Sequence, residues 1–370
     1  MILPLLLLVV GCPKEVPRVV KSTVVVPTIE GTPPPPKSDP LPGWRCGWTN
    51  APGVNRRPDE VWGFTLGGPI TAPIVVDGDQ VYAVADDTIY AFSADGHRLW
   101  ESKLPGVQGA ALSGDAIVAG GTEGKLYFLN RTDGKPRSST ERGGALVGQP
   151  VPIDGGWAWV TEEGIVATNA GWLQSFGQRP AGRPAADEST VYVTTVEGSL
   201  FAVSPKGVEW TVTLPAAAID GPALDEDNVY VSFAAKNGEP GGVVAYGRWG
   251  PMLAKERWRF HGEFQPLAAV GADIRQIYVP EKDGNVYALD PNTGEKQWNA
   301  EGYGEFSTQP LVALGSVYAG NSDGHLARID PDDGGVVWQV DLGAAVSAEP
   351  ALIGDRLVVG LANGRIIALQ

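Results

Sequence analysis

The stretch Ala288-Leu289-Asp290-Pro291-Asn292-Thr293-Gly294-Glu295-Lys296-Gln297-Trp298 is the clearest copy of a pattern that recurs along this chain of 370 residues. In each copy an apolar run leads through a turn to a second apolar run, and a tryptophan often follows. The first runs begin at or near Val81, Ile117, Ala158, Val191, Val229, Ile277, Val317 and Leu357. Their mean spacing of about 39 residues is typical of the four-stranded blades of a β-propeller.

Two local signals indicate that the repeat is antiparallel sheet. A proline precedes seven of the eight runs, where a strand that starts at an edge needs no backbone donor: Pro73, Pro150, Pro184, Pro222, Pro266, Pro310 and Pro350. Short turns such as Asp283-Gly284 and Asp323-Gly324 follow the runs and are strong hairpin signals. The sequence therefore predicts an all-β fold, an eight-bladed β-propeller of four-stranded antiparallel blades.

The tryptophans have a structural explanation. They follow the second turn of five copies, as Trp100, Trp210, Trp258, Trp298 and Trp338. A small residue stands in the preceding run of most copies, at Ala91, Ala167, Ala202, Ala245, Ala288 and Ala368, with Phe128 and Arg328 as exceptions. The second copy has Ser138 in place of the tryptophan, and the third offers Phe176 or Trp172. Blades bury their faces only against neighbouring blades, so we expect the tryptophans to pack there rather than stack on sugars.

The last copy stops at Gln370, before its outermost strand. Residues 61–66, which read VWGFTL, have the character of that strand. We predict that this N-terminal strand completes the eighth blade and leaves no open sheet edge in the ring. The predicted propeller therefore spans residues 58–370.

The pattern Ala-x-Asp-x-x-Thr-Gly-x-x-x-Trp in residues 288–298 resembles the tryptophan-docking motif of the pyrroloquinoline-quinone-like β-propellers. This resemblance implies the eight-bladed ring. It also raises one enzymatic hypothesis, a quinone- or carbohydrate-binding propeller with a dehydrogenase or sensory role. Those enzymes carry a bound calcium and, in many members, adjacent cysteines against the quinone. Here Cys12 and Cys46 are the two cysteines and both precede the repeats, so we expect no cofactor and no enzymatic activity.

Other residues give no sign of a catalytic or metal site. The three histidines, His97, His261 and His325, belong to different copies of the repeat, and none has a second ligand at metal-binding spacing. The acidic turn residues recur at the hairpin positions, where turn geometry explains them. The net charge of −15 offers no basic stripe to nucleic acid. A net charge of this size is consistent with an exported protein, in which it would favour solubility.

The N-terminus predicts export and a lipid anchor. Residues 2–10 are apolar but too short to span a bilayer, so we interpret residues 1–11 as a signal peptide. Val9-Val10-Gly11-Cys12 resembles the lipobox of bacterial lipoproteins, which implies lipidation of Cys12. An ordinary signal peptide is the alternative. Pro13 follows the cysteine in place of the aspartate that retains lipoproteins in the inner membrane, which favours the outer membrane, with the protein facing the periplasm.

Residues 12–57 are predicted to be a proline-rich tether, which includes the run Pro33-Pro34-Pro35-Pro36. Trp44 and Trp48 flank Cys46, and we expect this short segment to dock on the propeller because exposed tryptophans are costly. Cys46 is then either a buried thiol or a partner in an intermolecular disulfide.

Lipobox, tether and propeller together resemble the BamB family of outer-membrane assembly lipoproteins. That resemblance implies a non-enzymatic scaffold that binds envelope proteins, including the β-barrel assembly machinery. The longest copy of the repeat suggests where a partner would bind, because its loop is both basic and apolar. The candidate residues are Arg248, Trp249, Met252, Lys255 and Arg257. A second candidate is the turn with Arg131, Lys135, Arg137 and Arg142. Ordinary variation in the length of a surface loop is the alternative for both.

Overall fold

The computed structural model describes residues 47–113, 115–141, 144–302 and 304–370. All of these residues lie in one compact unit, Pro34–Gln370. The signal peptide, Cys12, Cys46 and Arg142 lie outside the described residues, so their assignments stay predictions. No helix in the described part of the chain has the length and hydropathy needed to cross a bilayer.

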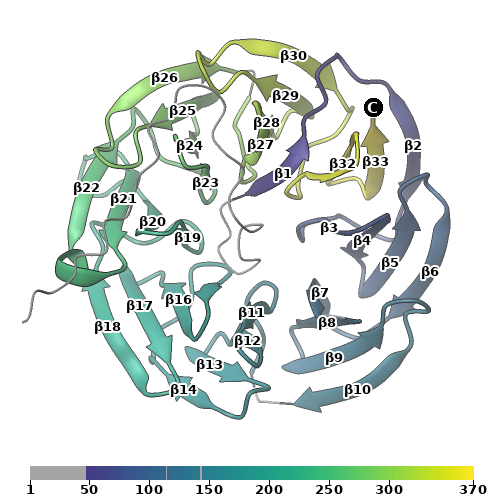
Figure 1. Ribbon diagram of the computed structural model, residues 1–370, viewed down its shortest axis with the longest axis horizontal. Helices are drawn as coiled ribbons and strands as arrows, with labels where there is room; N and C mark the ends of the chain where they lie inside the picture. Colours follow the sequence, from purple (N-terminus) through teal and green to yellow (C-terminus); the bar gives the residue numbers. More distant parts are fainter. Residues whose placement is uncertain (1–46, 114, 142–143, 303) are drawn as a thin grey trace, which may run out of the picture. The chain divides into compact units, whose positions relative to one another are not determined.

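The chain forms a ring of eight sheets, as the repeat predicts (Figure 1). We number these blades in chain order, and the strands of each blade run from the centre of the ring to its rim. The first four blades contain β3 (Val75–Asp77), β4 (Gln80–Ala85), β5 (Thr88–Ser93) and β6 (Arg98–Lys103); β7 (Val107–Ser113), β8 (Ala116–Gly121), β9 (Lys125–Asn130) and β10 (Pro136–Glu141); β11 (Val151–Ile153), β12 (Gly156–Val160), β13 (Ile165–Thr168) and β14 (Leu173–Ser175); and β15 (Ala185–Asp187), β16 (Thr190–Thr194), β17 (Ser199–Ser204) and β18 (Gly207–Thr213).

The other four blades follow the same order. They contain β19 (Ala223–Leu224), β20 (Asn228–Phe233), β21 (Gly242–Gly247) and β22 (Glu256–His261); β23 (Gly271–Ala272), β24 (Ile277–Pro280), β25 (Asn285–Leu289) and β26 (Lys296–Glu301); β27 (Leu311–Leu314), β28 (Ser316–Gly320), β29 (His325–Ile329) and β30 (Val336–Asp341); and β31 (Ala351–Ile353), β32 (Arg356–Gly360), β33 (Arg365–Leu369) and β2 (Glu60–Thr65). The fifth strand of blade seven is β1 (Trp48–Pro52), and a short 3-10 helix, η2 (Gly250–Met252), lies in blade five.

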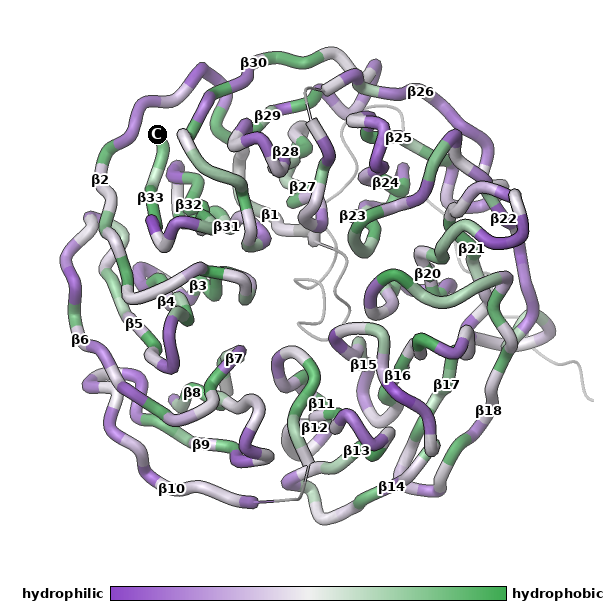
Figure 2. The backbone as a smooth tube through the Cα atoms, turned by 180° about the vertical axis from the view of Figure 1, so that it is seen from behind, coloured by the Kyte–Doolittle hydropathy of each residue, from purple (hydrophilic) through white to green (hydrophobic). Residues whose placement is uncertain are grey.

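Burial follows the position of a strand within its blade. The middle strands of blade five, β20 and β21, are buried at every residue. Rim strands such as β6 alternate between exposed and half-buried residues, because one side of the rim strand faces water. Figure 2 shows the same division, with apolar residues in strands such as β32 and β33 and hydrophilic ones along rim strands such as β6. The core is therefore divided among the interfaces between blades.

The tryptophans lock each blade to the next. Trp298 on β26 lies opposite Ala288 on β25, as the sequence predicts. Its indole Nε1 donates a hydrogen bond to the carbonyl of Pro331 in the following blade, at 2.9 Å. Trp100 and Trp258 make the same bond to Arg131 and Pro291. The ring of Trp298 lies so close to Gly334 that a Cβ there would overlap it, which explains why a glycine recurs in this turn.

Three blades depart from this pattern. In blade three the exposed Leu173 lies opposite Ala167. Neither Phe176 nor Trp172 therefore takes the place of the tryptophan, contrary to the prediction from sequence. In blade two Ser138 pairs with Phe128, and the bulk at the interface comes instead from Trp157 and Trp159 of blade three. In blade seven Arg328 stands opposite Trp338, where other blades have alanine. Blade seven has an arginine here because this side chain contacts the segment before β2, which closes the ring.

Blade eight is built from both ends of the described chain. Strand β2 pairs antiparallel with β33, and Asp59 and Gln370 exchange two backbone hydrogen bonds of 3.0 Å. The side chain of Arg365 holds Glu60 with contacts of 2.8 and 2.9 Å. The blade therefore has four strands but no turn between its last two, and the segment before β2 takes over that turn's role.

This segment runs from β1 across blade seven. Strand β1 pairs in parallel with β27 at the centre of the ring, within the range 12–57 that the sequence assigns to the tether. The carbonyl of Val54 then accepts hydrogen bonds from Trp338 Nε1, at 3.1 Å, and from the hydroxyl of Tyr318, at 3.4 Å. Arg328 donates to the carbonyl of Asn55. Val54 thus replaces the missing turn of blade eight, and Arg328 is needed to hold it.

Candidate partner-binding site

The candidate loop connects β21 to β22 in blade five and comprises residues 248–255, which we call the blade-five knob. Its chain turns back tightly, since Gly250 and Ala254 both have positive φ, 58° and 56°. The amide of Ala254 donates to the carbonyl of Gly247, and that of Lys255 to Met252, both at 2.9 Å. These bonds give the knob one defined backbone conformation.

Arg248 does not belong to a partner-binding surface. Its side chain is only 1% exposed and forms an ion pair with Asp187, which is 8% exposed, at the end of β15 in blade four. Its Nη1 also donates to the carbonyl of Asp225, and its guanidinium lies 5.5 Å from the centre of the Tyr192 ring. The prediction for Arg248 is therefore wrong, because the charge that suggested a surface residue is used inside the protein to fasten the knob to blades four and five.

Tyr192 completes this buried ion pair. Burial raises its pKa to about 12, so its hydroxyl remains protonated at neutral pH and donates to Asp187 at 3.0 Å. The two donors satisfy a carboxylate that would otherwise be costly to bury. Sequence could have indicated this role only through Asp187, the last residue of β15, which has no distinctive pattern around it.

Trp249 lies on the surface and is nevertheless held in place. Its side chain is 57% exposed. Its Nε1 donates to the carbonyl of Glu226, and the guanidinium of Arg248 lies 5.0 Å from its ring centre. Leu253, which sequence reasoning missed, is 44% exposed on the same knob. An exposed aromatic side chain that is already ordered is suited to binding a partner, because little conformational entropy remains to be lost.

The remaining predicted residues surround this pair. Met252 is half-buried, whereas Lys255 and Arg257 are exposed. The Nη1 atom of Arg257 donates to Asn228 Oδ1 at 2.6 Å. The structure therefore brings together one aromatic, one aliphatic and two cationic side chains around the knob.

The second candidate, the turn of blade two, is engaged by the protein's own carboxylates. Arg131 forms an ion pair with Asp77 of blade one at 2.7 Å, and Arg137 with Asp115 at 2.8 Å. Lys135 lies 3.1 Å from Asp133. These contacts stabilise the turn and its junction with blade one, so the turn offers less to a partner than the blade-five knob.

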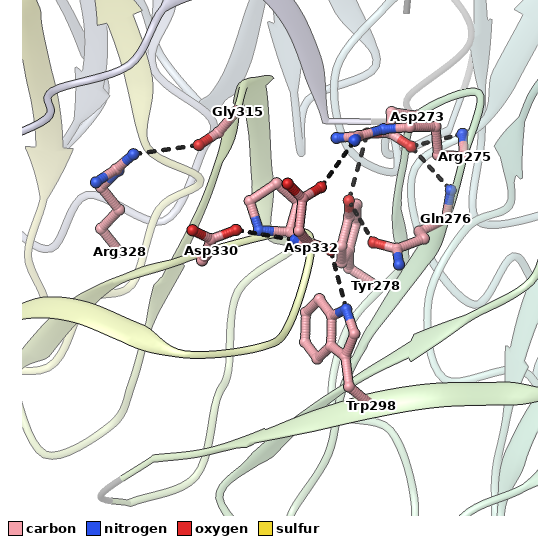
Figure 3. Close-up of polar contacts among 10 residues, drawn as sticks. Asp273, Arg275, Gln276, Tyr278, Trp298, Gly315, Arg328, Asp330 and Asp332 are labelled. Atoms are coloured by element: carbon pink, nitrogen blue, oxygen red, sulfur yellow. Dashed lines mark hydrogen bonds and ion pairs between the residues drawn. The ribbon is translucent and has the colours of Figure 1, made fainter. Parts of the chain in front are cut away.

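A cluster of carboxylates between blades six and seven could be mistaken for an active site (Figure 3). Burial raises the pKa of Asp273, but its Oδ1 accepts hydrogen bonds from the backbone amides of Arg275 and Gln276, at 2.7 and 2.8 Å. Arg275 in turn binds Asp332 of the next blade at 2.9 Å. The cluster therefore shapes a turn and joins two blades.

The described residues form no site that fits the calcium and quinone that the dehydrogenases with this repeat carry. Within residues 47–370, apart from the positions that are not described, no group of three or more His, Cys, Asp or Glu residues is arranged to hold a metal ion. Near the axis, Arg183 forms an ion pair with Glu349, so that blade four is bound to blade eight on the opposite side of the ring. One contact of this pair, Nη1 to Oε2, is 3.1 Å.

Comparisons with known proteins agree with this geometry. The family model described as "Outer membrane protein assembly factor BamB" matches residues 58–151, 161–247 and 251–370. Solved structures with the same fold include the computationally designed Ika8 protein, with a TM-score of 0.72 and 16% identity, over 84% of this chain and 98% of that one. BamB from Moraxella catarrhalis has a TM-score of 0.67 and 17% identity, over 85% of this chain and 97% of its own. No curated protein matches.

At these identities the solved structures establish the fold alone, whereas the family model covers most of the propeller. The chain belongs to the family of the outer membrane protein assembly factor BamB.

Proposed function

We propose that this chain is a non-enzymatic scaffold, anchored in the outer membrane by a lipid on Cys12 and facing the periplasm, that takes part in assembling outer-membrane β-barrel proteins. Membership of the BamB family supports this role. The use of the buried carboxylates in structural contacts, as at Asp187 and Asp273, favours a scaffold over an enzyme.

The partner-binding surface that we propose is the blade-five knob, with Trp249, Leu253 and Lys255 in contact with another envelope protein. The observation that carries this assignment is the exposed yet ordered side chain of Trp249. The cationic residues around it would favour a groove with acidic groups at its edge. The strongly negative net charge makes nucleic acid an unsuitable partner.

Crosslinking in intact envelopes followed by affinity purification of the full chain tests this function. The wild type should copurify with β-barrel assembly proteins, and Trp249→Ala combined with Leu253→Ala should reduce the yield by about tenfold, as expected for a binding hot spot. Leu99→Ala is the matched control, because Leu99 is also 44% exposed but lies at the rim of blade one. Equal loss in the control, or no loss in the double variant, would refute the assignment of the knob.

The lipid anchor has its own test. Cys12→Ser should move the protein from the membrane fraction to the soluble periplasmic fraction and abolish incorporation of a labelled fatty acid. Addition of pyrroloquinoline quinone and calcium to the purified protein tests the enzymatic alternative. A saturable change in visible absorbance would contradict the proposal of a non-enzymatic scaffold.

A further inference from the structure

Blade five differs from the other blades at both ends of its rim strand. The knob lies before β22, and the connector that follows β22 leads to β23 of blade six. The two segments therefore lie on opposite faces of the ring. The connector begins Gly262-Glu263-Phe264, and Phe264 is 51% exposed. A second large apolar side chain is thus displayed on the face that the knob does not reach.

The backbone that displays Phe264 is held by a buried carboxylate. The amide of Phe264 donates to Glu281 Oε2 at 3.3 Å, and Glu281 is 0% exposed. Its other oxygen, Oε1, has no hydrogen-bond partner among the described residues. This oxygen lies against Gly262, where any Cβ would overlap it. The connector therefore fits closely over a carboxylate whose bonding capacity is only partly used.

The other blades show that this carboxylate is not required by the fold. Glu281 makes the same isolated bridge in blade six that Thr195 makes in blade four and Asn321 in blade seven. Thr195 accepts from the amide of Ser199 at 3.0 Å and donates to Gln178 at 2.8 Å, so its hydroxyl is satisfied within its own blade. In blade three the hydroxyl of Thr161, at the same position, also has no hydrogen-bond partner among the described residues, but it carries no charge. A buried glutamate at this position costs more stability than a hydroxyl, because its charged form is desolvated.

Two acidic residues, Glu263 and Asp283, and one basic residue, Lys282, lie next to Glu281, so the surroundings carry a net negative charge. Desolvation by burial, together with the charges of Asp283 and Glu263, raises the pKa of Glu281 to about 7. A positive group brought to this surface would lower the energy of all three carboxyl groups at once, with the largest effect where water is excluded. A protein partner supplies such a positive group as the ammonium of lysine or the guanidinium of arginine.

We propose that this surface, made by Glu263, Phe264 and Asp283 over the carboxylate of Glu281, is a second docking site, which binds an extended protein segment with lysine or arginine beside an apolar residue. The apolar residue packs on Phe264, and the cation lies against Glu263 and Asp283, with the charge of Glu281 buried beneath them. Since the knob is at the other end of β22, blade five can hold two different partners on its two faces. This inference goes beyond the proposed function and does not depend on the knob.

A defined probe tests the proposal with the full-length protein. The probe is a fluorescein-labelled peptide of alternating lysine and leucine, five residues long, and its acidic counterpart has glutamate in place of lysine. Anisotropy titrations at low salt and pH 8, where Glu281 is ionised, should show binding of the basic peptide and none of the acidic one. Phe264→Ser and Glu281→Gln should each weaken binding by about tenfold, because they remove the apolar contact and the buried negative charge respectively.

Two control variants separate this site from general attraction to an acidic protein. Val196 in blade four is 42% exposed and stands beside an acidic residue, Glu197. The buried position that Glu281 occupies in blade six is occupied here by Thr195, so Val196→Ser removes an exposed apolar side chain next to a buried hydroxyl rather than a buried carboxylate. It should leave the affinity for the basic peptide unchanged, as should Leu99→Ala at the rim of blade one. Equal affinities for wild type and Phe264→Ser, equal loss in Val196→Ser, or binding of the acidic peptide would each overturn the proposal. Thermal unfolding of every variant verifies that it is folded.

Discussion

Replacing Glu281 by glutamine should stabilise the protein at neutral and alkaline pH, and only there. The carboxyl group has an ordinary pKa of 4.5, which burial and the neighbouring Asp283 and Glu263 raise to about 7. Between these two values the folded protein binds a proton that the unfolded chain does not. The free energy of unfolding therefore falls as pH rises from about 4.5 to about 7.

The magnitude follows from the size of that shift. A difference of about 2.5 pKa units corresponds to about 3 kcal/mol, so wild type should lose roughly this much stability between pH 4 and pH 8 through Glu281 alone. Glutamine has nearly the same shape, keeps an oxygen for the amide of Phe264 and does not titrate. The variant should consequently lack this loss, and its advantage over wild type should grow from pH 4 to pH 8.

Urea unfolding at several pH values, followed by tryptophan fluorescence, measures this difference. Subtracting the wild-type value at each pH removes the contributions of the other titrating groups, which both proteins share. Glu123→Gln, at the exposed turn of blade two, is the control and should give a difference that does not vary with pH. A flat difference for Glu281→Gln, or one that grows toward acid, would refute the reasoning.

Three other substitutions or deletions test the packing of the ring. Arg248→Met should cost about 3–5 kcal/mol in urea unfolding because it leaves Asp187 buried without its ion pair, and adding Asp187→Leu should recover most of the loss; no recovery would contradict the buried pair. Gly134→Ala should cost about 1–3 kcal/mol more than Gly155→Ala, since both have positive φ but only the first Cβ overlaps a neighbour, the ring of Trp100; equal losses would show that φ alone matters. Deleting residues 60–65 should abolish the cooperative thermal transition seen by circular dichroism, and a shortened chain that still melts cooperatively would disprove the closure of blade eight by β2.

The sequence predicts the ring because each repeated residue solves a local packing problem. Trp298 needs Ala288 opposite it and Gly334 beneath it in the next blade, and all three recur at fixed spacing. The sequence shows Arg328 as an exception to the repeat but does not explain it. The group that Arg328 contacts is a backbone carbonyl more than 270 positions earlier in the chain. Contacts of this kind leave no periodic pattern.

The candidate site was harder to predict for a related reason. The loop of blade five is rich in arginine and tryptophan, yet the sequence gives no means of distinguishing the buried Arg248 from the exposed Trp249 beside it. Glu281 was missed entirely, because an acidic residue before a turn is common in this repeat. Only its burial, with one oxygen unsatisfied, separates it from the surface carboxylates around it.

The pairing of β2 with β33 also sets the order in which the molecule can be completed. Glu60 and Arg365, which meet across this pair, are 305 positions apart in the chain. During synthesis or export β2 emerges first and has no partner until the last strand arrives, so its open edge is exposed to other chains for almost the whole process. The strand that closes the finished ring is therefore the one that waits longest for its partner while the molecule folds.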